Sequence, residues 1–457
     1  MQIDKNTNSQ ARERLSLLLT FDDVDDEGTV DDGIYSEINS MVKEKDALTG
    51  VISAYGYVNG NAVYAFSQDK SLNSGAVGAA QADKIAKLYE LAAKTGTPIV
   101  GIHDSNGAFM DGTAASLAAY GKMLGASSVI SGVVPQIAVI AGTCAGTAAM
   151  LACSSDFVIM TKDSEFFMAP NSSSGSAEAA AKSGIASAVC DDDKAAIEKA
   201  RDLVNILPVN NLAPVPMFEF AENSPVSGTD LKSIINSAAD ADSEIEISAE
   251  FGNASYTGFV TIGGATAGIA AAGKEGSKLN SDDCAKLARF MRTCDAFSIP
   301  VVTFVNSEGF EDADAVSSIK AMTTLANSYS EATTVKIAVV TGKAVGPVFA
   351  AVAGNSSNSD FTYAYPDAVI APVSSAAAVE FMWHDKLKGT DNLESARNEL
   401  ISEYEKTLAS AETAAENNFI DDIIDPSQTR NVLVSALDIL SGKRVQKLPK
   451  KHNNIQF

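Results

Sequence analysis

The feature that most constrains the fold of this chain is a stretch that occurs twice. Ile137–Met150 reads IAVIAGTCAGTAAM and Ile337–Ala350 reads IAVVTGKAVGPVFA, 200 positions further along. Each begins with an apolar run that fits a buried strand, continues through a glycine that permits a tight turn, and ends in small residues that fit a helix. A chain that contains this unit twice is expected to use it twice.

The similarity between the two halves extends beyond these stretches. Upstream of each copy, two strand-like runs are followed by a helical run, a strand that begins at a proline, and a polar turn that contains glycine. Internal similarity on this scale predicts an α/β protein with two homologous domains. We place the domains at 1–222 and 223–457, and the segment 205–220, which contains Pro208 and Pro214, is expected to connect them.

The turn after each repeated strand is a candidate site for an anionic oxygen. The first N–H groups of a helix have no partner inside the helix, and the helix dipole adds partial positive charge at that end. A helix that begins after Gly146 or Gly346 could therefore hold a developing oxyanion with backbone donors alone. The alternative is that glycine and alanine only let a helix pack closely on a strand.

A second polar turn follows a neighbouring strand in each half. The predicted strand Pro98–His103 ends in DSNGA at Asp104–Ala108, and the predicted strand Pro300–Val305 ends in NSEGF at Asn306–Phe310. Ligands of α/β proteins usually bind at such strand ends. His103 is a candidate base, although a histidine inside a strand is more often a core or edge residue.

Charge and cysteine content exclude several classes of protein. The net charge is −24, so neither a nucleic acid nor an anionic membrane is expected as a partner. A polyanionic small ligand stays possible, because a few lysines or helix N-termini suffice to hold its phosphates. The five cysteines form no CxxC pair and no zinc-like cluster with histidine. Free thiols in a reducing cytoplasm and no metal site are therefore predicted.

The remaining motifs indicate no other chemistry. Cys144 lies beside the first turn, but no nearby histidine would activate it, so a buried side chain is the simpler interpretation. The acidic run 22–32 lacks the spacing of an EF-hand and is expected to be a solvated loop. The N-terminus has no apolar signal-peptide core, and the apolar stretch 133–153 is interrupted by Pro135 and by glycines. A cytoplasmic protein without a membrane span is predicted.

Taken in order, the motifs along the chain resemble a known family. They include ARER, AVYAFSQD, SGVVPQIAVIAGTCAGTAA, CDAFSIPVVTFV, EATTVKIAVVTGKAVG, DPSQTRNVLVSALDILSGKR and PKKHNNIQ. The chain resembles, nearly end to end, the carboxyltransferase subunits of biotin-dependent acyl-CoA carboxylases and of the related sodium-pumping acyl-CoA decarboxylases. Each motif is weak alone, whereas their order over the full length is specific.

The resemblance implies two crotonase-like domains of the ββα spiral type and an enzyme that moves a carboxyl group between biotin and the α-carbon of a short acyl-CoA. It also implies coenzyme A as part of the substrate and biotin on a separate carrier protein, since the chain has no Met-Lys-Met-like biotinylation site. A biotin carboxylase or a membrane decarboxylase subunit would be a further partner. The expected assembly is a homo- or hetero-hexamer, a trimer of dimers.

The resemblance also assigns roles at the turns. The oxyanion hole for the thioester enolate would carry over to Gly146 and Thr147, and the hole for the ureido oxygen of biotin to Gly346 and Val348. Four neighbouring residues would line the substrate sites. These are Gly107, Ala108, Ala145 and Pro347.

The chain departs from the family pattern near these turns. Pro347 stands where the family usually has glycine, and proline has no N–H to donate. Phe109 stands where arginine is common, Asn106 replaces a glycine, and a shorter acidic segment, 311–320, replaces a longer loop. These changes keep open a non-enzymatic alternative, a catalytically degenerate scaffolding subunit paired with an active homologue. A biotin-independent crotonase-like hydratase or decarboxylase would need placed carboxylates, for which Glu165 and Glu308 are the candidates.

Overall fold

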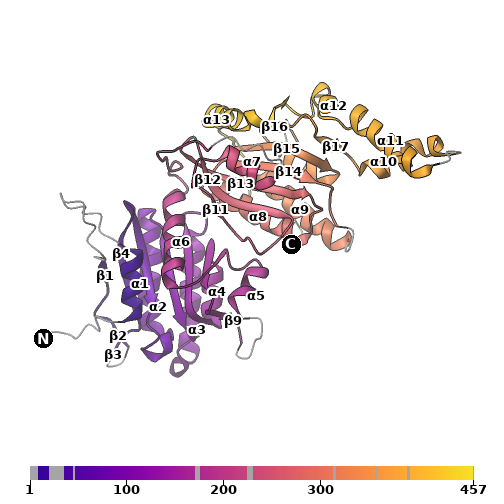
Figure 1. Cartoon of the computed structure of the whole chain (residues 1–457). Coiled ribbons are helices and arrows are strands. Elements are labelled where there is room, and N and C mark those ends of the chain that lie inside the picture. The colour runs from indigo at the N-terminus through magenta and orange to yellow at the C-terminus, as the bar shows by residue number, and fades with distance from the viewer. Residues whose placement is uncertain are drawn as a thin grey trace. The chain divides into compact units, whose positions relative to one another are not determined.

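The computed structural model of the chain describes residues 9–19, 35–44, 47–169, 175–223, 230–311, 315–355, 358–388 and 392–455. The chain divides into two compact units, unit 1 at Met1–Pro216 and unit 2 at Met217–Phe457 (Figure 1). The sequence placed this boundary later, after residue 222. Unit 2 begins earlier because Met217 forms a β-bridge with Ala265, and the N–H of Phe218 donates to the carbonyl of Gly264 over 2.8 Å.

Unit 1 consists of one sheet with helices on both of its faces and a small separate hairpin. Its strands are β1 Ser36–Ile38, β2 Lys43–Glu44, β3 Ala47–Leu48, β4 Val51–Val58, β5 Asn61–Gln68, β6 Ile99–Ser105, β7 Gln136–Ala145, β8 Phe157–Thr161, β9 Glu165–Phe167 and β10 Ala188–Cys190. Its helices are α1 Gln10–Leu18, α2 Ala79–Thr95, α3 Ala114–Ile130, α4 Thr147–Cys153, α5 Ala177–Lys182 and α6 Asp193–Ile206, with 3₁₀ turns at Asn73–Gly75 and Met110–Gly112.

Unit 2 repeats this order and adds a helical hairpin, α10–α11, before its last strand. Its strands are β11 Ile245–Glu246, β12 Ser255–Ile262, β13 Ala265–Gly276, β14 Val301–Ser307, β15 Lys336–Val345, β16 Phe361–Ala364, β17 Val369–Ala371 and β18 Asp422–Ile423. Its helices are α7 Leu231–Ala238, α8 Ser281–Ala296, α9 Ala315–Glu331, the π-helical turn η4 Phe349–Ala353, α10 Ser375–Leu387, α11 Leu393–Thr407, α12 Ala411–Glu416, the 3₁₀ turn η5 Pro426–Gln428 and α13 Thr429–Leu440.

The two sheets have the same topology. The strand orders are β1-β4-β5-β6-β7-β8-β10 and β11-β12-β13-β14-β15-β16-β18, with β9 paired to β7 and β17 paired to β15. Each sheet opens with an antiparallel hairpin, β4–β5 or β12–β13, and continues with parallel strands. The internal similarity of the sequence therefore corresponds to two structural repeats.

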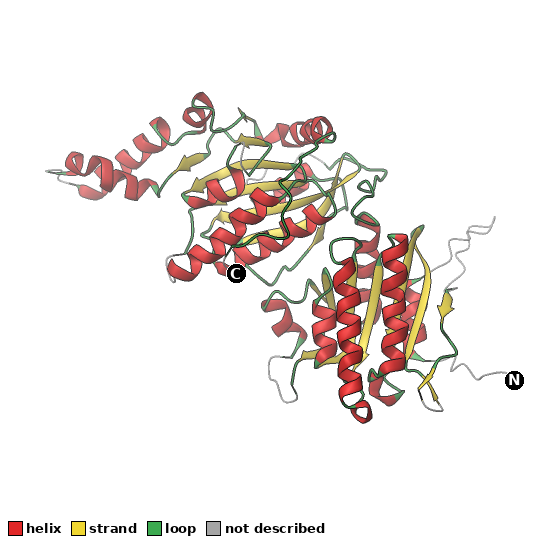
Figure 2. Cartoon of the chain, turned by 180° about the vertical axis from the view of Figure 1, so that it is seen from behind, coloured by secondary structure: helices red, strands yellow, loops and turns green. Residues whose placement is uncertain are grey.

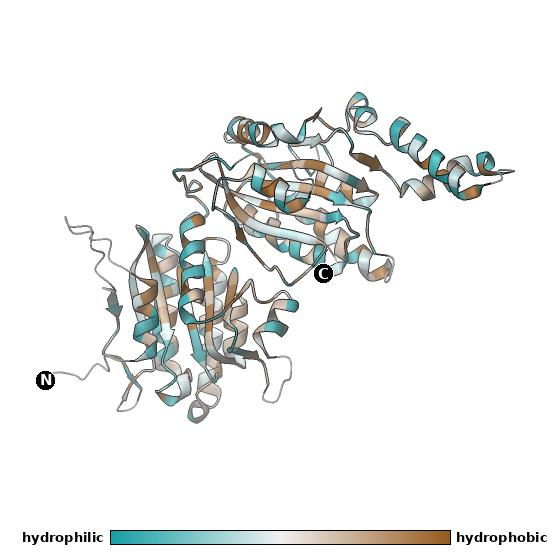
Figure 3. Ribbon diagram, in the orientation of Figure 1, coloured by the Kyte–Doolittle hydropathy of each residue, from teal (hydrophilic) through white to brown (hydrophobic). Residues whose placement is uncertain are grey.

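Apolar side chains place each sheet between two layers of helices (Figure 2). In unit 1, α2 packs on α3 and α1 packs on α6; in unit 2, α8 packs on α9 and α7 packs on α13. All eight residues of β12 are buried, and the strands of both sheets carry much of the hydrophobic colour in Figure 3. Strands covered on both faces are expected to be apolar throughout, as these are.

In unit 1, an arginine forms hydrogen bonds both to the end of the first helix and to the turn of the β4–β5 hairpin. Arg201, on α6, donates to the carbonyl of Leu18 at the end of α1 over 2.6 Å and to the side-chain oxygen of Asn59 over 3.2 Å. Asn59 and Gly60 form the β4–β5 turn, with φ values of 49° and 80°. This left-handed pair is what an Asn-Gly hairpin turn requires.

Unit 2 contains the same arrangement with an added carboxylate. Arg430, on α13, donates to the carbonyl of Ala238 at the end of α7 over 3.0 Å and to Asp240 over 2.5 Å. Asp240 also accepts the N–H groups of Gly263 and Gly264, which form the β12–β13 turn. Burial alone would raise the pKa of Asp240, but the hydrogen bonds, led by the one from Arg430, bring it below its ordinary value.

We expect Asp240→Asn to destabilise unit 2 by about 3 kcal/mol at pH 7, because the substitution leaves Arg430 without a buried counter-charge. The pKa of Asp240 is lowered on folding, so its contribution is present above the unfolded pKa and is lost as the pH falls through the folded value. The difference between natural protein and variant should therefore shrink below about pH 4. Urea unfolding followed by the fluorescence of Trp383, the one tryptophan of the chain, measures this.

The control for this prediction is Glu222→Gln. Glu222 also faces Arg430, at 4.0 Å, but its side chain is 74% exposed. Such a pair is expected to contribute less than about 1 kcal/mol. Equal losses for the two variants would contradict the role given to Asp240.

Candidate active site

Both sheets change register at the same point, immediately before the repeated glycine turn. In unit 1, β6 pairs with β7 at His103 and Ile140 and next at Ser105 and Cys144. In unit 2 the corresponding jump lies between Val305 paired to Val340 and Ser307 paired to Ala344. Strand β7, like β15, therefore bulges outward by two residues just before it ends.

A polar side chain from the neighbouring strand fills each bulge. Asp104 accepts the N–H of Thr143 over 3.2 Å, and Asn306 accepts the N–H of Lys343 over 3.0 Å. A buried backbone N–H costs free energy unless it is hydrogen-bonded, so these acceptors make the bulge possible. The two units thus use a carboxylate and an amide for the same purpose.

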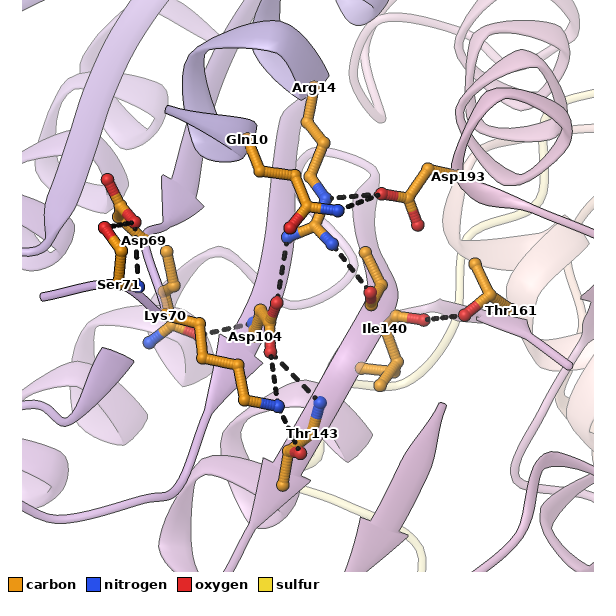
Figure 4. A network of polar contacts seen from close by, with 12 residues as sticks. Gln10, Arg14, Asp69, Lys70, Ser71, Asp104, Ile140, Thr143, Thr161 and Asp193 are labelled. Atoms are coloured by element: carbon orange, nitrogen blue, oxygen red, sulfur yellow. Dashed lines mark hydrogen bonds and ion pairs between the residues drawn. The ribbon is translucent and has the colours of Figure 1, made fainter. Parts of the chain in front are cut away.

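The carboxylate in unit 1 is balanced by a buried arginine (Figure 4). Arg14, on α1, lies 3.1 Å from Asp104 and 2.7 Å from Asp193, and it donates to the carbonyl of Ala141 inside the bulge over 2.7 Å. Arg14 and Asp104 are only 2% and 3% exposed. Asn306 is uncharged and needs no such counter-ion. The ARER motif near the N-terminus therefore stabilises the end of β7.

We expect Gly142→Ala to destabilise unit 1 by about 2 kcal/mol, because a Cβ at this position would overlap the Asp104 carboxylate. Gly342→Ala should act alike in unit 2, where the Cβ would overlap the side-chain oxygen of Asn306. Hydrogen exchange of the amides in β6, β7, β14 and β15 reports the loss of protection.

Gly121→Ala, on α3, is the matched control. No heavy atom lies within 4 Å of a Cβ placed there. Alanine should stabilise the helix by up to about 1 kcal/mol. If Gly142→Ala and Gly121→Ala have the same effect, the bulge does not need the glycine.

Within the described residues, the turn after β7 leaves two backbone N–H groups without an acceptor. Gly146 has φ +62° and donates its N–H to the carbonyl of Phe167 over 2.8 Å. Helix α4 starts at Thr147, and among the described residues no acceptor pairs with the N–H groups of Thr147 and Ala148. Gly146 thus shapes the turn, whereas the donors available to a ligand come from the two residues that follow it.

The turn after β6 lies against this one and adds a third donor. Gly107 has φ +100°, and a Cβ at this position would lie 2.8 Å from the carbonyl of Ala145. Val77 pairs with both neighbours of Ala108, accepting from Phe109 over 2.9 Å and donating to Gly107 over 2.9 Å. In the described part of the chain, the N–H of Ala108 between them has no acceptor.

Unit 2 has the same geometry with one donor fewer. Gly346 has φ +63° and donates its N–H to the carbonyl of Ala371 over 2.7 Å, as Gly146 does to Phe167. Pro347 follows at the position of Thr147, so no N–H is present there. The described contacts leave the N–H groups of Val348 and Phe310 without an acceptor.

The side chains considered for catalysis from the sequence differ in their surroundings. His103 is 3% exposed and packs edge-on against Phe66, and burial lowers its pKa to about 4. Cys144 is fully buried, and burial followed by the charge of Asp104 raises the pKa of its thiol. A neutral, enclosed histidine and a protonated thiol are poorly suited to act as base and nucleophile.

Two cations lie near the turns and were not singled out from the sequence. Lys70 donates to the hydroxyl of Thr143 over 3.0 Å and lies 3.6 Å from Asp104. Lys343 forms an ion pair with Glu308 over 2.7 Å. Single lysines carry no pattern in sequence, and only the pairing of distant strand ends brings these to the turns.

The remaining predictions from the sequence concern two acidic segments, the candidate carboxylate Glu165 and the absence of a membrane span. The acidic run 22–32 lies outside the described residues, as do 312–314 within the segment after NSEGF. Glu165 lies at the start of β9 and is exposed. In the part of the chain that the structure describes, no helix is both long and apolar enough to cross a membrane.

Residues 5–455 match the model of the carboxyl transferase domain family. The chain belongs to this family. It is 32% identical to the propionyl-CoA carboxylase beta chain of Roseobacter denitrificans, covering 97% of this chain and 93% of that protein. It is also 32% identical to the methylmalonyl-CoA decarboxylase subunit alpha of Propionigenium modestum, covering 97% and 92%. The resemblance drawn from the motifs is thereby confirmed, as is the enzyme class, a carboxyltransferase.

A solved structure supports the fold in the same way. The carboxyltransferase chain matches a transcarboxylase 12S structure with a TM-score of 0.89 and 31% identity, covering 98% of this chain and 92% of that one. That protein is described as a hexamer and was solved with methylmalonyl-coenzyme A bound. The predicted fold class, two crotonase-like domains in tandem, is confirmed. The roles given to individual residues at the turns stay predictions.

Proposed function

We propose that this carboxyltransferase moves a carboxyl group between biotin and the α-carbon of a short acyl-CoA, of the acetyl-, propionyl-, malonyl-, methylmalonyl- or glutaconyl-CoA class. The observation that carries the proposal is the repeated turn, since each unit presents backbone N–H groups without an acceptor at the ends of two adjacent strands within the described residues. The reaction places negative charge on one oxygen of each reactant. Two sets of fixed donors suit two such oxygens.

Unit 1 is proposed to bind the thioester. When the carbon–carbon bond to the carboxyl group breaks, its electron pair moves onto the thioester, whose oxygen becomes an enolate. The N–H groups of Ala108 and Thr147 would donate to that oxygen, and Gly107, Ala145 and Gly146 would shape the wall around it. The carboxyl group passes to N1 of biotin, and the proton from N1 replaces it on the α-carbon. Atoms and charge balance without a side-chain acid or base.

Unit 2 is proposed to hold the ureido oxygen of biotin. Val348 and Phe310 offer N–H groups, while Gly346 sets the turn and Pro347 contributes only shape. Biotin would arrive on a separate carrier protein and would act as a second substrate of this chain. Two donors fit a carbonyl oxygen that carries partial charge.

The partners form part of the same proposal. A biotin carboxyl carrier protein and either a biotin carboxylase or a membrane decarboxylase subunit would complete the reaction, and the chain would assemble as a homo- or hetero-hexamer. The hexameric transcarboxylase 12S structure supports such an assembly. The direction of transfer would follow from the partner. A cytoplasmic location and the absence of a nucleic-acid partner stay predictions from the sequence.

One observation favours a second candidate function. Pro347 removes an N–H at the position where Thr147 offers one, and loss of one oxyanion donor costs about 3 kcal/mol of transition-state stabilisation. A subunit impaired in this way could act as a scaffold for an active homologue. It would still bind acyl-CoA in unit 1.

The experiment that separates these functions measures decarboxylation of malonyl-CoA and methylmalonyl-CoA by the purified protein with free biotin, beside a Pro347→Gly variant. We expect biotin-dependent turnover by the natural protein, and an increase of up to about 100-fold in the variant because glycine restores the donor. Turnover only in the glycine variant would contradict an active natural enzyme and favour the second candidate function.

The converse substitution tests unit 1. Thr147→Pro should lower the rate of acyl-CoA decarboxylation by about 100-fold, because it removes an N–H from the enolate site. Proline is tolerated at the first position of a helix, and Pro347 occupies that position in unit 2, so the fold should persist. Thr147→Gly, which keeps the N–H, is the control, and equal activity of the proline and glycine variants would contradict the assignment.

A further inference from the structure

An ion pair spans the two strand ends beside the turn of unit 2. Lys343 lies in the bulge of β15, and Glu308 follows β14 immediately before Gly309. Their charged atoms are 2.7 Å apart, and their side chains are 42% and 45% exposed. The pair is therefore open to a ligand from solvent.

Unit 1 also has an ammonium group beside its turn, but the lysine that carries it comes from a different segment of the chain. Thr143 is the counterpart of Lys343, since each donates its backbone N–H to the polar side chain that fills the bulge. The ammonium of Lys70, from the segment after β5, lies 3.0 Å from the hydroxyl of Thr143. Two unrelated segments thus bring one positive charge to each turn, balanced by Asp104 in one unit and by Glu308 in the other.

The two turns differ in the number of backbone N–H groups that they offer to a ligand. The turn of unit 1 retains the N–H of Thr147, whereas Pro347 removes its equivalent in unit 2. An ammonium group has three donors, and within the described residues Lys343 uses one, toward Glu308. Hydrogen bonds from a charged donor are about twice as strong as those from a neutral one.

We propose that Lys343 supplies to the second substrate the donor that Pro347 withholds, and that Glu308 is a positioning residue that keeps Lys343 at the turn. This inference rests on the proposed function, in which unit 2 holds the ureido oxygen of biotin. Negative charge grows on that oxygen when N1 loses its proton to become a nucleophile. Lys343 would stabilise the charge without a backbone N–H.

The test is kinetic and uses the full chain with free biotin and malonyl-CoA. Lys343→Met should reduce kcat/KM for biotin by about 30-fold, the effect expected for one charged hydrogen bond. Malonyl-CoA binding, measured by calorimetry, should stay unchanged. Lys343→Arg should recover most of the activity. In a Pro347→Gly background, Lys343→Met should reduce kcat/KM for biotin by only about three-fold, because the restored N–H also donates to the ureido oxygen.

Lys122→Met is the matched control, since Lys122 forms a similarly short ion pair with Asp83, at 2.8 Å, on the exposed surface of α2 and α3. Unchanged biotin kinetics in Lys343→Met would overturn the inference while leaving the proposed function intact. Equal losses from Lys343→Met in the natural protein and in the Pro347→Gly variant would do the same.

Two further outcomes are distinguishable from these. If the natural protein shows no biotin-dependent turnover, the proposed function fails and this inference fails with it. If Lys343→Met loses malonyl-CoA binding and also has a lowered melting temperature, the role of Lys343 is structural and the inference is overturned.

Discussion

Both candidate turns depend on a hydrogen bond that joins a side chain of one strand to a displaced backbone N–H of the next strand. Asp104 accepts from Thr143, and Asn306 accepts from Lys343. Each bond stabilises two extra residues in the longer strand, and a glycine with positive φ follows the end of that strand. The bulge and the glycine together turn the chain away from the hydrogen-bonded strands, so the N–H groups after the glycine do not pair with the sheet.

The two units fill the bulge with acceptors of different charge, a carboxylate in unit 1 and a neutral amide in unit 2. A buried carboxylate must be paired, so unit 1 uses Arg14 from the N-terminal helix and contacts Lys70 as well. Asn306 is half-buried and carries no charge, so hydrogen bonds alone satisfy it and no arginine is needed. This difference explains why α1 carries a buried charge. Because Asn306 carries no charge, the ammonium group of Lys343 beside the turn of unit 2 pairs instead with the exposed Glu308.

Local patterns in the sequence predicted much of the fold. In each half, the predicted helical run, now assigned as α2 or α8, and the predicted strand that follows it, now assigned as β6 or β14, are confirmed because each rests on apolar periodicity within a few residues. The bulges could not be predicted in this way, since they depend on pairing between strands about forty residues apart. The boundary between the two units also involves a contact between distant positions, because Met217 bridges to Ala265.

The sequence places the candidate site through its glycines, and the hydrogen bonds around them come from the structure. The repeated Gly146 and Gly346 located both turns, yet their own N–H groups donate to Phe167 and Ala371. No sequence pattern reveals which of several consecutive N–H groups is already bonded. The position of Pro347 and its equivalence to Thr147, 200 positions earlier, were both visible in the sequence. The ammonium groups of Lys70 and Lys343 had no signal at all.

The proposed reaction depends on two sets of backbone donors, one for each reactant. A crystal structure with a non-decarboxylating malonyl-CoA analogue and biotin bound would show whether these donors hold the two oxygens. We expect the thioester oxygen within about 3 Å of the nitrogens of Ala108 and Thr147, and the ureido oxygen at the same distance from the nitrogen of Val348. A thioester oxygen bound to water or side chains, away from these nitrogens, would contradict this expectation.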